Sequence, residues 1–213
     1  MTKLNFFKLY TPFLLVFILF FNDVKAQPIP VELMLGNNYG SVNITFSKKF
    51  SPESRFGVFL LNSVEFDYNE DYKNSLILKN MLTLETVKNL DVVGGLIYTN
   101  GGLSPQTGLL YTLVKEKFFF LCNPNINIES DPVYDIMTIL QFTPKINDRF
   151  HLYTRLKFLN VFTADHNIKS YQWVRLGLET KGLSFGLAFN LDEHGPNPSV
   201  ETNFGLFVQK DIF

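Results

Sequence analysis

A chain of 213 residues is long enough for one domain or for two small ones. Only 18% of its residues are charged, whereas 46% are hydrophobic and 23 are Phe, and soluble domains average roughly 25% charged residues. The formal net charge of −1 gives no indication of a nucleic-acid partner. The single cysteine, Cys122, excludes an intrachain disulfide framework or a multi-cysteine metal site.

The N-terminal segment 1–26 has the pattern of a secretory signal peptide. Two lysines precede an apolar run over residues 9–21, and small residues before Gln27 supply a cleavage site. The alternative is an N-terminal membrane anchor, but the run has 13 residues, fewer than the roughly 20 that a spanning helix needs. Cleavage would leave residues 27–213 as one exported domain with 16 basic and 19 acidic side chains.

The rest of the chain alternates apolar and polar residues with a period of two, which is typical of β-strands with unlike faces. Over residues 183–191, large apolar side chains take the odd positions and Ser, Gly, Ala and Asn take the even ones. No later segment is long and apolar enough for a transmembrane helix. The pattern predicts about twelve strands, with about ten as the alternative count. The expected spans are 30–36, 41–50, 55–68, 75–88, 91–99, 105–115, 118–128, 133–145, 149–163, 169–180, 183–192 and 200–213.

The expected connections fall into a short set and a long set, which is typical of outer-membrane barrels. Paired strands must keep like faces together, so the loop length has to match the parity of the flanking apolar positions. The lengths at 51–55, 116–117, 147–149 and 181–182 pass this test. The short set is 51–55, 89–90, 116–117, 147–149 and 181–182, and the long set is 69–75, 99–107, 127–132, 163–170 and 192–199.

Alternation alone does not decide whether the apolar face points into a core or out to lipid. A soluble secreted β-barrel or sandwich would bury that face, whereas a membrane barrel turns it outward around a polar interior. Large side chains dominate one face in nearly every expected strand, and the other face carries small, polar and charged groups. Charged residues in mid-strand favour the membrane barrel, because they would line its lumen: Lys79, Glu85, Asp135, Arg155, Arg175 and Glu179.

A signal peptide, an even number of amphipathic strands and the final residue Phe213 resemble the outer-membrane β-barrel proteins of Gram-negative bacteria, as a class rather than one family. The resemblance covers residues 27–213. It implies one all-β, antiparallel transmembrane barrel in the outer membrane, in contact with its lipid. In that class the last strand ends in an aromatic residue with apolar residues at alternate positions before it. Here the apolar residues over 204–208 are out of phase with Phe213, and we expect a bulge near Lys210 to reset the phase.

The polar face of the expected barrel supplies the candidate functional residues, and two interpretations of its charges are open. The charges could line a narrow aqueous pore and set its solute preference, or pair across the lumen and plug it. Barrels of about eight strands are filled by side chains and those of about sixteen enclose a channel, so the strand count does not decide. A regular hairpin would place Glu179 near Arg155. The lumen-facing candidates are His151, Tyr153, Arg155, Lys157, Arg175, Glu179, Asp135, Lys79, Glu85 and Glu65.

The leading functional hypothesis is a porin-like passive channel for small polar solutes, which Arg155 and Lys157 would bias toward anions. The second hypothesis is a non-transporting barrel that acts as a structural, accessory or adhesion protein through its long loops. The third is a lipid hydrolase that uses His166 with Ser170 as its nucleophile, although the two follow no hydrolase motif. The expected partners are outer-membrane lipid and a small polar solute, and the sequence predicts no oligomeric state. No cofactor or metal is expected, because His151, His166 and His194 lack metal-ligand spacing.

Overall fold

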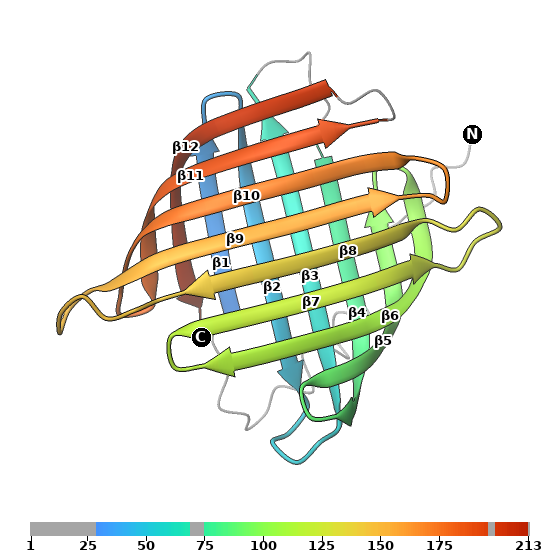
Figure 1. The fold of residues 1–213 in the computed structure, drawn as a ribbon, viewed down its shortest axis with the longest axis horizontal. Coiled ribbons are helices and arrows are strands. Elements are labelled where there is room, and N and C mark those ends of the chain that lie inside the picture. Colours follow the sequence, from blue (N-terminus) through green and yellow to red (C-terminus); the bar gives the residue numbers. More distant parts are fainter. Residues whose placement is uncertain (1–28, 69–74, 196–198, 213) are drawn as a thin grey trace, which may run out of the picture.

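Twelve antiparallel strands close into a single barrel in the computed structural model, which describes residues 29–68, 75–195 and 199–212 (Figure 1). Each strand pairs with its neighbour in sequence, and β1 pairs with β12 to close the sheet. The predicted all-β barrel and its count of twelve strands are confirmed. The expected signal peptide lies outside the described residues. The strands are β1 (Ile29–Gly36), β2 (Tyr39–Lys49), β3 (Phe56–Asp67), β4 (Ser75–Val87), β5 (Leu90–Thr99), β6 (Gly102–Lys115), β7 (Phe118–Asn127), β8 (Tyr134–Phe142), β9 (His151–Phe162), β10 (Asn167–Thr180), β11 (Leu183–His194) and β12 (Ser199–Ile212).

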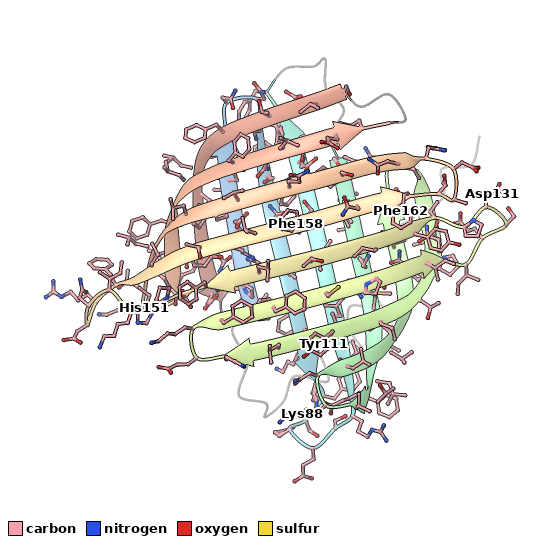
Figure 2. All side chains as sticks on the ribbon, viewed as in Figure 1. Lys88, Tyr111, Asp131, His151, Phe158 and Phe162 are labelled. Atoms are coloured by element: carbon pink, nitrogen blue, oxygen red, sulfur yellow. The ribbon has the colours of Figure 1, made fainter. Side chains whose placement is uncertain are left out.

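The outside of the barrel is apolar. Successive residues of a strand face opposite sides of the sheet, and the outward positions carry side chains such as Leu82 and Leu206, each 63% exposed. Figure 2 shows the strands nearest the viewer with Tyr111 on β6 and Phe158 on β9. A continuous exposed apolar surface of this kind suits lipid hydrocarbon rather than water. No helix in the described part of the chain is long and apolar enough to cross a membrane.

The lumen is only partly polar, which differs from the uniformly polar interior expected of a membrane barrel. On β3, for example, the inward side chains include Phe59 and Leu61, which are almost completely buried. Both faces of that strand are apolar along this stretch, so the alternation there does not distinguish lumen from lipid. The apolar side of the lumen consists of Phe59, Leu61, Met81, Val93, Leu110, Leu121, Met137, Ile139, Leu159, Tyr171 and Trp173.

The observed strand pairing places most of the short turns where the sequence predicted them. The Phe50 N–H donates to the Phe56 carbonyl at 3.0 Å and closes the loop 51–55. The pairs Lys115 with Phe118 and Thr180 with Leu183 leave loops of the expected lengths at 116–117 and 181–182. Lys181 and Gly182 both adopt positive φ, at 49° and 70°, which two-residue hairpins of this type require. The Lys145–His151 bridge likewise centres its hairpin on 147–149.

Three predicted connections were wrong. The long loop expected at 163–170 covers only 163–166, because β10 begins at Asn167. The supposed long loop 99–107 is a tight turn, because Thr99 pairs directly with Gly102 and β6 continues through the Ser and Pro that follow. The turn expected at 89–90 lies at 88–89, since a bulge between Glu85 and Val87 shifts the register by one residue. The barrel therefore has fewer long loops than the composition suggested.

The bulge expected near Lys210 does not occur. Strand β12 pairs with β1 and with β11 through Lys210 without a register shift. Gln209 therefore stays on the inward face, where its side-chain oxygen accepts hydrogen bonds from Tyr153 at 3.1 Å and Arg155 at 2.9 Å. A polar residue is favourable at this position because it faces the lumen. Phe213 lies outside the described residues.

Glycines let β10 and β11 approach closely on the lumen face. Gly177 is paired directly with Gly186. A Cβ added at Gly186 would lie 2.2 Å from the Leu176 carbonyl oxygen and 2.5 Å from the Cα of Gly177. Both contacts are with backbone, which cannot move without disturbing the pairing.

We predict that Gly186→Ala lowers the free energy of unfolding by about 1–3 kcal/mol, the usual cost of inserting a carbon into a packed site. Urea unfolding of the refolded barrel, followed by its heat-modifiable gel migration, measures this loss. Gly94→Ala is the matched control, since a Cβ there meets no atom within 4 Å. Equal destabilisation by the two substitutions would contradict the explanation.

Candidate functional site

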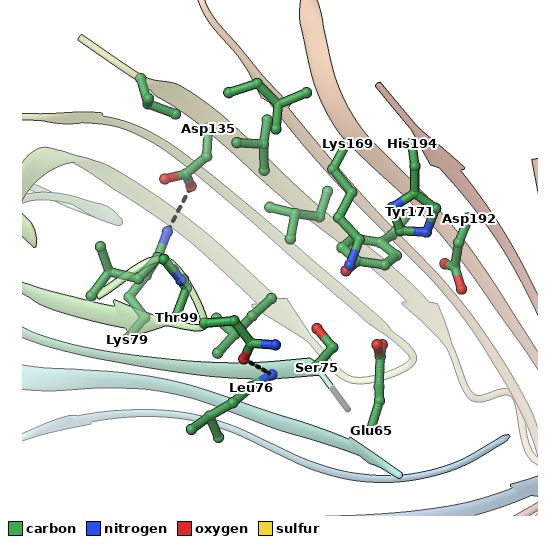
Figure 3. Close-up of a pocket in the computed structure, with 18 of the residues that line it drawn as sticks. Glu65, Ser75, Leu76, Lys79, Thr99, Asp135, Lys169, Tyr171, Asp192 and His194 are labelled. Carbon is green, nitrogen blue, oxygen red and sulfur yellow. Dashed lines mark hydrogen bonds and ion pairs between the residues drawn. The ribbon is translucent and has the colours of Figure 1, made fainter. Parts of the chain in front are cut away.

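A cavity of about 770 Å³ occupies the end of the lumen near turns 37–38 and 100–101, and we call it the vestibule. Its lining runs from Thr99 and Glu201 near the strand ends down to Lys79 and Asp135. Figure 3 shows Lys169, Tyr171, Asp192 and His194 grouped on one side, with the Lys79–Asp135 pair away from them on the other. Pockets of this volume accept drug-sized or smaller molecules.

Carboxylates outnumber ammonium groups along the vestibule. Six acidic side chains and two lysines line it, so its described lining has a formal net charge of −4, counting His194 as neutral. Charge of one sign along a confined cavity attracts solutes of the opposite sign. The acidic residues are Glu65, Asp67, Glu129, Asp135, Asp192 and Glu201, and the lysines are Lys79 and Lys169.

An ion pair between Lys79 and Asp135 lies at the base of the vestibule. The Lys79 Nζ is 2.6 Å from the Asp135 Oδ1, and both side chains are almost fully buried. The same carboxylate accepts hydrogen bonds from Asn125 at 3.0 Å and from Gln106. Strands β4 and β8 are not neighbours in the sheet, so this pair connects separate walls of the barrel.

A second buried ion pair, between Arg175 and Glu32, joins β10 to β1. The Arg175 Nη2 and Nε donate to the Glu32 Oε1 at 2.9 and 3.1 Å, and its Nη1 donates to Asn190 at 2.8 Å. Beside them is a void of about 20 Å³, with room for about one water molecule. Arg155 and Lys157 also line this void. We call the four charged residues around it the constriction.

Of the other two cations of the constriction, Lys157 is buried and Arg155 is half-buried. The Arg155 Nη1 donates to Gln209 at 2.9 Å, while its Nε has no hydrogen-bond partner among the described residues. The Lys157 Nζ lies 4.5 Å from the centroid of the Trp173 ring, close enough for a cation–π interaction. Three cations thus lie around the void that Glu32 lines, and only Arg175 bonds to this carboxylate among the described residues. Of the two interpretations of the polar face, this arrangement agrees with charges that pair across the lumen.

Other predicted site residues lie away from the constriction. Glu179 is paired with His151, and the residue opposite Arg155 is Arg175, so the expected proximity of Glu179 to Arg155 was wrong. Glu85 forms an exposed ion pair of 2.5 Å with Lys49 near the opposite end of the barrel from the vestibule. The pairing register explains the position of Glu179, which lies four residues further along β10 than Arg175.

Tyr153 and Glu65 are the remaining candidates, and both face the interior. Tyr153 is fully buried, and its ring packs against Phe207 with centroids 5.5 Å apart. Glu65 lines the vestibule. Tyr153 therefore contributes to packing beneath the vestibule, whereas Glu65 contributes charge to it.

Two residues of the site were not among the predicted lumen-facing candidates. Glu32 is the counterion of Arg175, and Asp192 accepts hydrogen bonds from Tyr39 at 2.6 Å and from the Trp173 Nε1 at 3.0 Å. The phase of each strand already placed Glu32 and Asp192 on the polar face. Their partners on other strands could not be read from that phase.

The hydrolase hypothesis required His166 to contact Ser170. The His166 Nδ1 instead lies 3.2 Å from the Thr163 hydroxyl, and the Ser170 hydroxyl is hydrogen-bonded to Asn167. The expected Ser–His contact is therefore not made. Within the described ranges, no group of three or more His, Cys, Asp or Glu side chains could hold a metal ion.

Two porins of known structure share the fold. A NanC porin is 10% identical to this chain, with 88% of this chain and 100% of that chain covered and a TM-score of 0.50. A KdgM porin is 9% identical with the same coverage and a TM-score of 0.50. No family model matches the chain, and no curated protein matches it. The fold and the exposed apolar belt together identify an outer-membrane β-barrel, in agreement with the predicted class and location.

We predict that Asp135→Asn lowers the free energy of unfolding by about 3–5 kcal/mol, because it leaves the Lys79 ammonium buried without its counterion. The double variant Lys79→Met, Asp135→Asn should recover most of that loss, since no uncompensated charge is left. Urea titrations of the refolded variants measure both values. A double variant as unstable as the single one would show that the ion pair is not the cause.

Proposed function

We propose that the protein is a porin-like passive channel for small polar solutes, closed or nearly closed in the conformation described above. The observation that carries this proposal is that the vestibule and the constriction lie in one lumen and are joined by a chain of hydrogen-bonded polar side chains. Asp192 lines the vestibule and binds Tyr39, Tyr39 accepts a hydrogen bond from Asn190 at 2.9 Å, and Asn190 accepts one from Arg175. A polar route thus runs from the vestibule to the constriction along β2, β10 and β11.

The constriction has the properties expected of a gate that opens by hydration. Three cations surround one carboxylate that is bonded to Arg175 alone among the described residues, and the Arg155 Nε has no partner there. Unsatisfied buried charge is costly, so water that enters here would gain hydrogen bonds that the protein does not provide. A modest rearrangement of side chains would then widen the void without disturbing the strands.

Opposite charges in the two zones set the solute preference of the proposed channel. The vestibule is acidic and the constriction is basic, so an ion of either sign meets repulsion in one of them. Neutral polar and zwitterionic solutes avoid this penalty. The preference for anions that the sequence predicted was based on Arg155 and Lys157, and it did not take the acidic vestibule into account.

A non-transporting barrel that acts through its loops is the second candidate. The connections at 37–38, 100–101 and 163–166 are short, which offers a loop-based adhesin little surface at these three positions. In outer-membrane barrels the short turns face the periplasm. If turns 116–117 and 181–182 do so here, the vestibule opens to the outside of the cell.

We expect the double variant Glu32→Ala, Arg175→Ala to raise the single-channel conductance in planar bilayers several-fold. It removes both side chains of the Glu32–Arg175 pair and leaves neither charge without its partner. Swelling of liposomes in glycine or arabinose should also accelerate, relative to wild type. Lys49→Ala, Glu85→Ala is the matched control, because it removes an exposed ion pair outside the constriction. The wild-type protein and the double variant could both fold correctly and yet neither conduct ions nor admit solute. That result would end the channel proposal in favour of a non-transporting barrel.

A further inference from the structure

The vestibule contains a binding site whose chemistry suits one class of ligand. We propose that it binds a small organic cation, an ammonium group attached to an apolar body. This inference rests on the proposed function only in so far as the vestibule would be the mouth of the channel. Binding itself requires no passage through the constriction.

The acidic wall of the vestibule would hold the ammonium group. Glu65 on β3, Asp192 on β11 and Glu201 on β12 all line the cavity. The Lys169 ammonium is within electrostatic reach of all three carboxylates, and its Nζ lies 4.2 Å from the centroid of the Tyr171 ring. The His194 Nε2 lies 4.0 Å from the Glu201 Oε2. With His194 neutral, one lysine does not balance three carboxylates, so this wall retains a negative charge that a bound cation would neutralise.

Two buried polar atoms along the same cavity lack partners. The Tyr171 hydroxyl belongs to a side chain that is only 3% exposed, and it makes no hydrogen bond within the described residues. The Gln106 Oε1 is likewise unsatisfied, although its side chain is 2% exposed and its Nε2 donates to Asn127 and Asp135. Gln106 bonds to Asp135, on the side of the vestibule away from Asp192, so the Tyr171 hydroxyl is the unpartnered acceptor beside the acidic wall. Ammonium groups are donors only.

The opposite wall of the vestibule is apolar and would accept the body of the ligand. Ile77 and Val161 line the cavity and also pack against the buried apolar side of the lumen. Ile97, Val133 and Leu159 extend this wall. Binding pockets for small molecules commonly combine such an apolar lining with a few polar groups that fix orientation. An inorganic cation would leave this wall without a partner.

The single tryptophan provides a direct readout of occupancy. The Trp173 Nε1 donates to Asp192, so a cation that engages this carboxylate should change the emission of Trp173. The test uses the mature barrel refolded in detergent and titrated with phenethylamine. Phenylpropionate, of similar size and opposite charge, is the comparison ligand. We expect saturable quenching with the amine and binding at least roughly tenfold weaker with the acid, the difference that one charge-assisted hydrogen bond provides.

Two variants assign the binding to this wall. Glu65→Gln should weaken amine binding by roughly tenfold, the effect of one charge-assisted contact. Tyr171→Phe should weaken it several-fold while leaving the urea-unfolding midpoint unchanged or higher, because the hydroxyl it removes has no partner to lose. Glu116→Gln is the matched control, since it removes the same charge from the exposed turn near the opposite end of the barrel. Heat-modifiable migration verifies the fold of each variant.

The outcomes separate this inference from the proposed channel. Equal affinity for phenethylamine and phenylpropionate, or amine binding unchanged in both folded Glu65→Gln and Tyr171→Phe, would overturn the ammonium site. Selective amine binding without conductance or liposome swelling would retain the site and remove the channel. Solute passage without amine binding would retain the channel and remove the site.

Discussion

Closure of the sheet between β1 and β12 is the constraint on which the rest of this structure depends. In the hydrocarbon core of a membrane no water satisfies free backbone groups, so a sheet can span it only if every strand has two neighbours. The pairs from Ile29 with Ile212 to Gly36 with Gly205 provide this closure. Once the sheet is closed, every inward side chain has to be accommodated in one enclosed space.

The lumen meets that requirement by separating its contents into two kinds. Apolar side chains around Met81, Met137 and Trp173 fill one side as a conventional core. Charged side chains occupy the rest and find partners across the barrel, as Lys79 does with Asp135 and Arg175 with Glu32. These pairs do not explain stability by themselves, because desolvation offsets much of their attraction. They do fix the position of each charged group, and hence the shape of the space left open.

Sequence reasoning gave the barrel because one physical rule, the period of two, governs nearly all of the chain. It placed the strands to within a few residues and assigned Arg155, Lys157 and Arg175 to the polar face. The same rule is silent about distances across the lumen. Glu179 and Glu32 both lie on polar faces, yet only Glu32 reaches Arg175, because β1 closes against β12 and curves round to face β10. The long-loop prediction at 99–107 was wrong for a different reason: Gly, Ser and Pro there are typical of loops, but pairing with β5 overrides that local preference.

The separation of charge along the barrel axis has an electrical consequence. An acidic vestibule at one end and a basic constriction further in give the lumen a fixed dipole. An applied membrane voltage adds to the field of this dipole in one polarity and opposes it in the other. Any current through the barrel would therefore rectify, and the direction of rectification would report which way round the barrel sits in the bilayer.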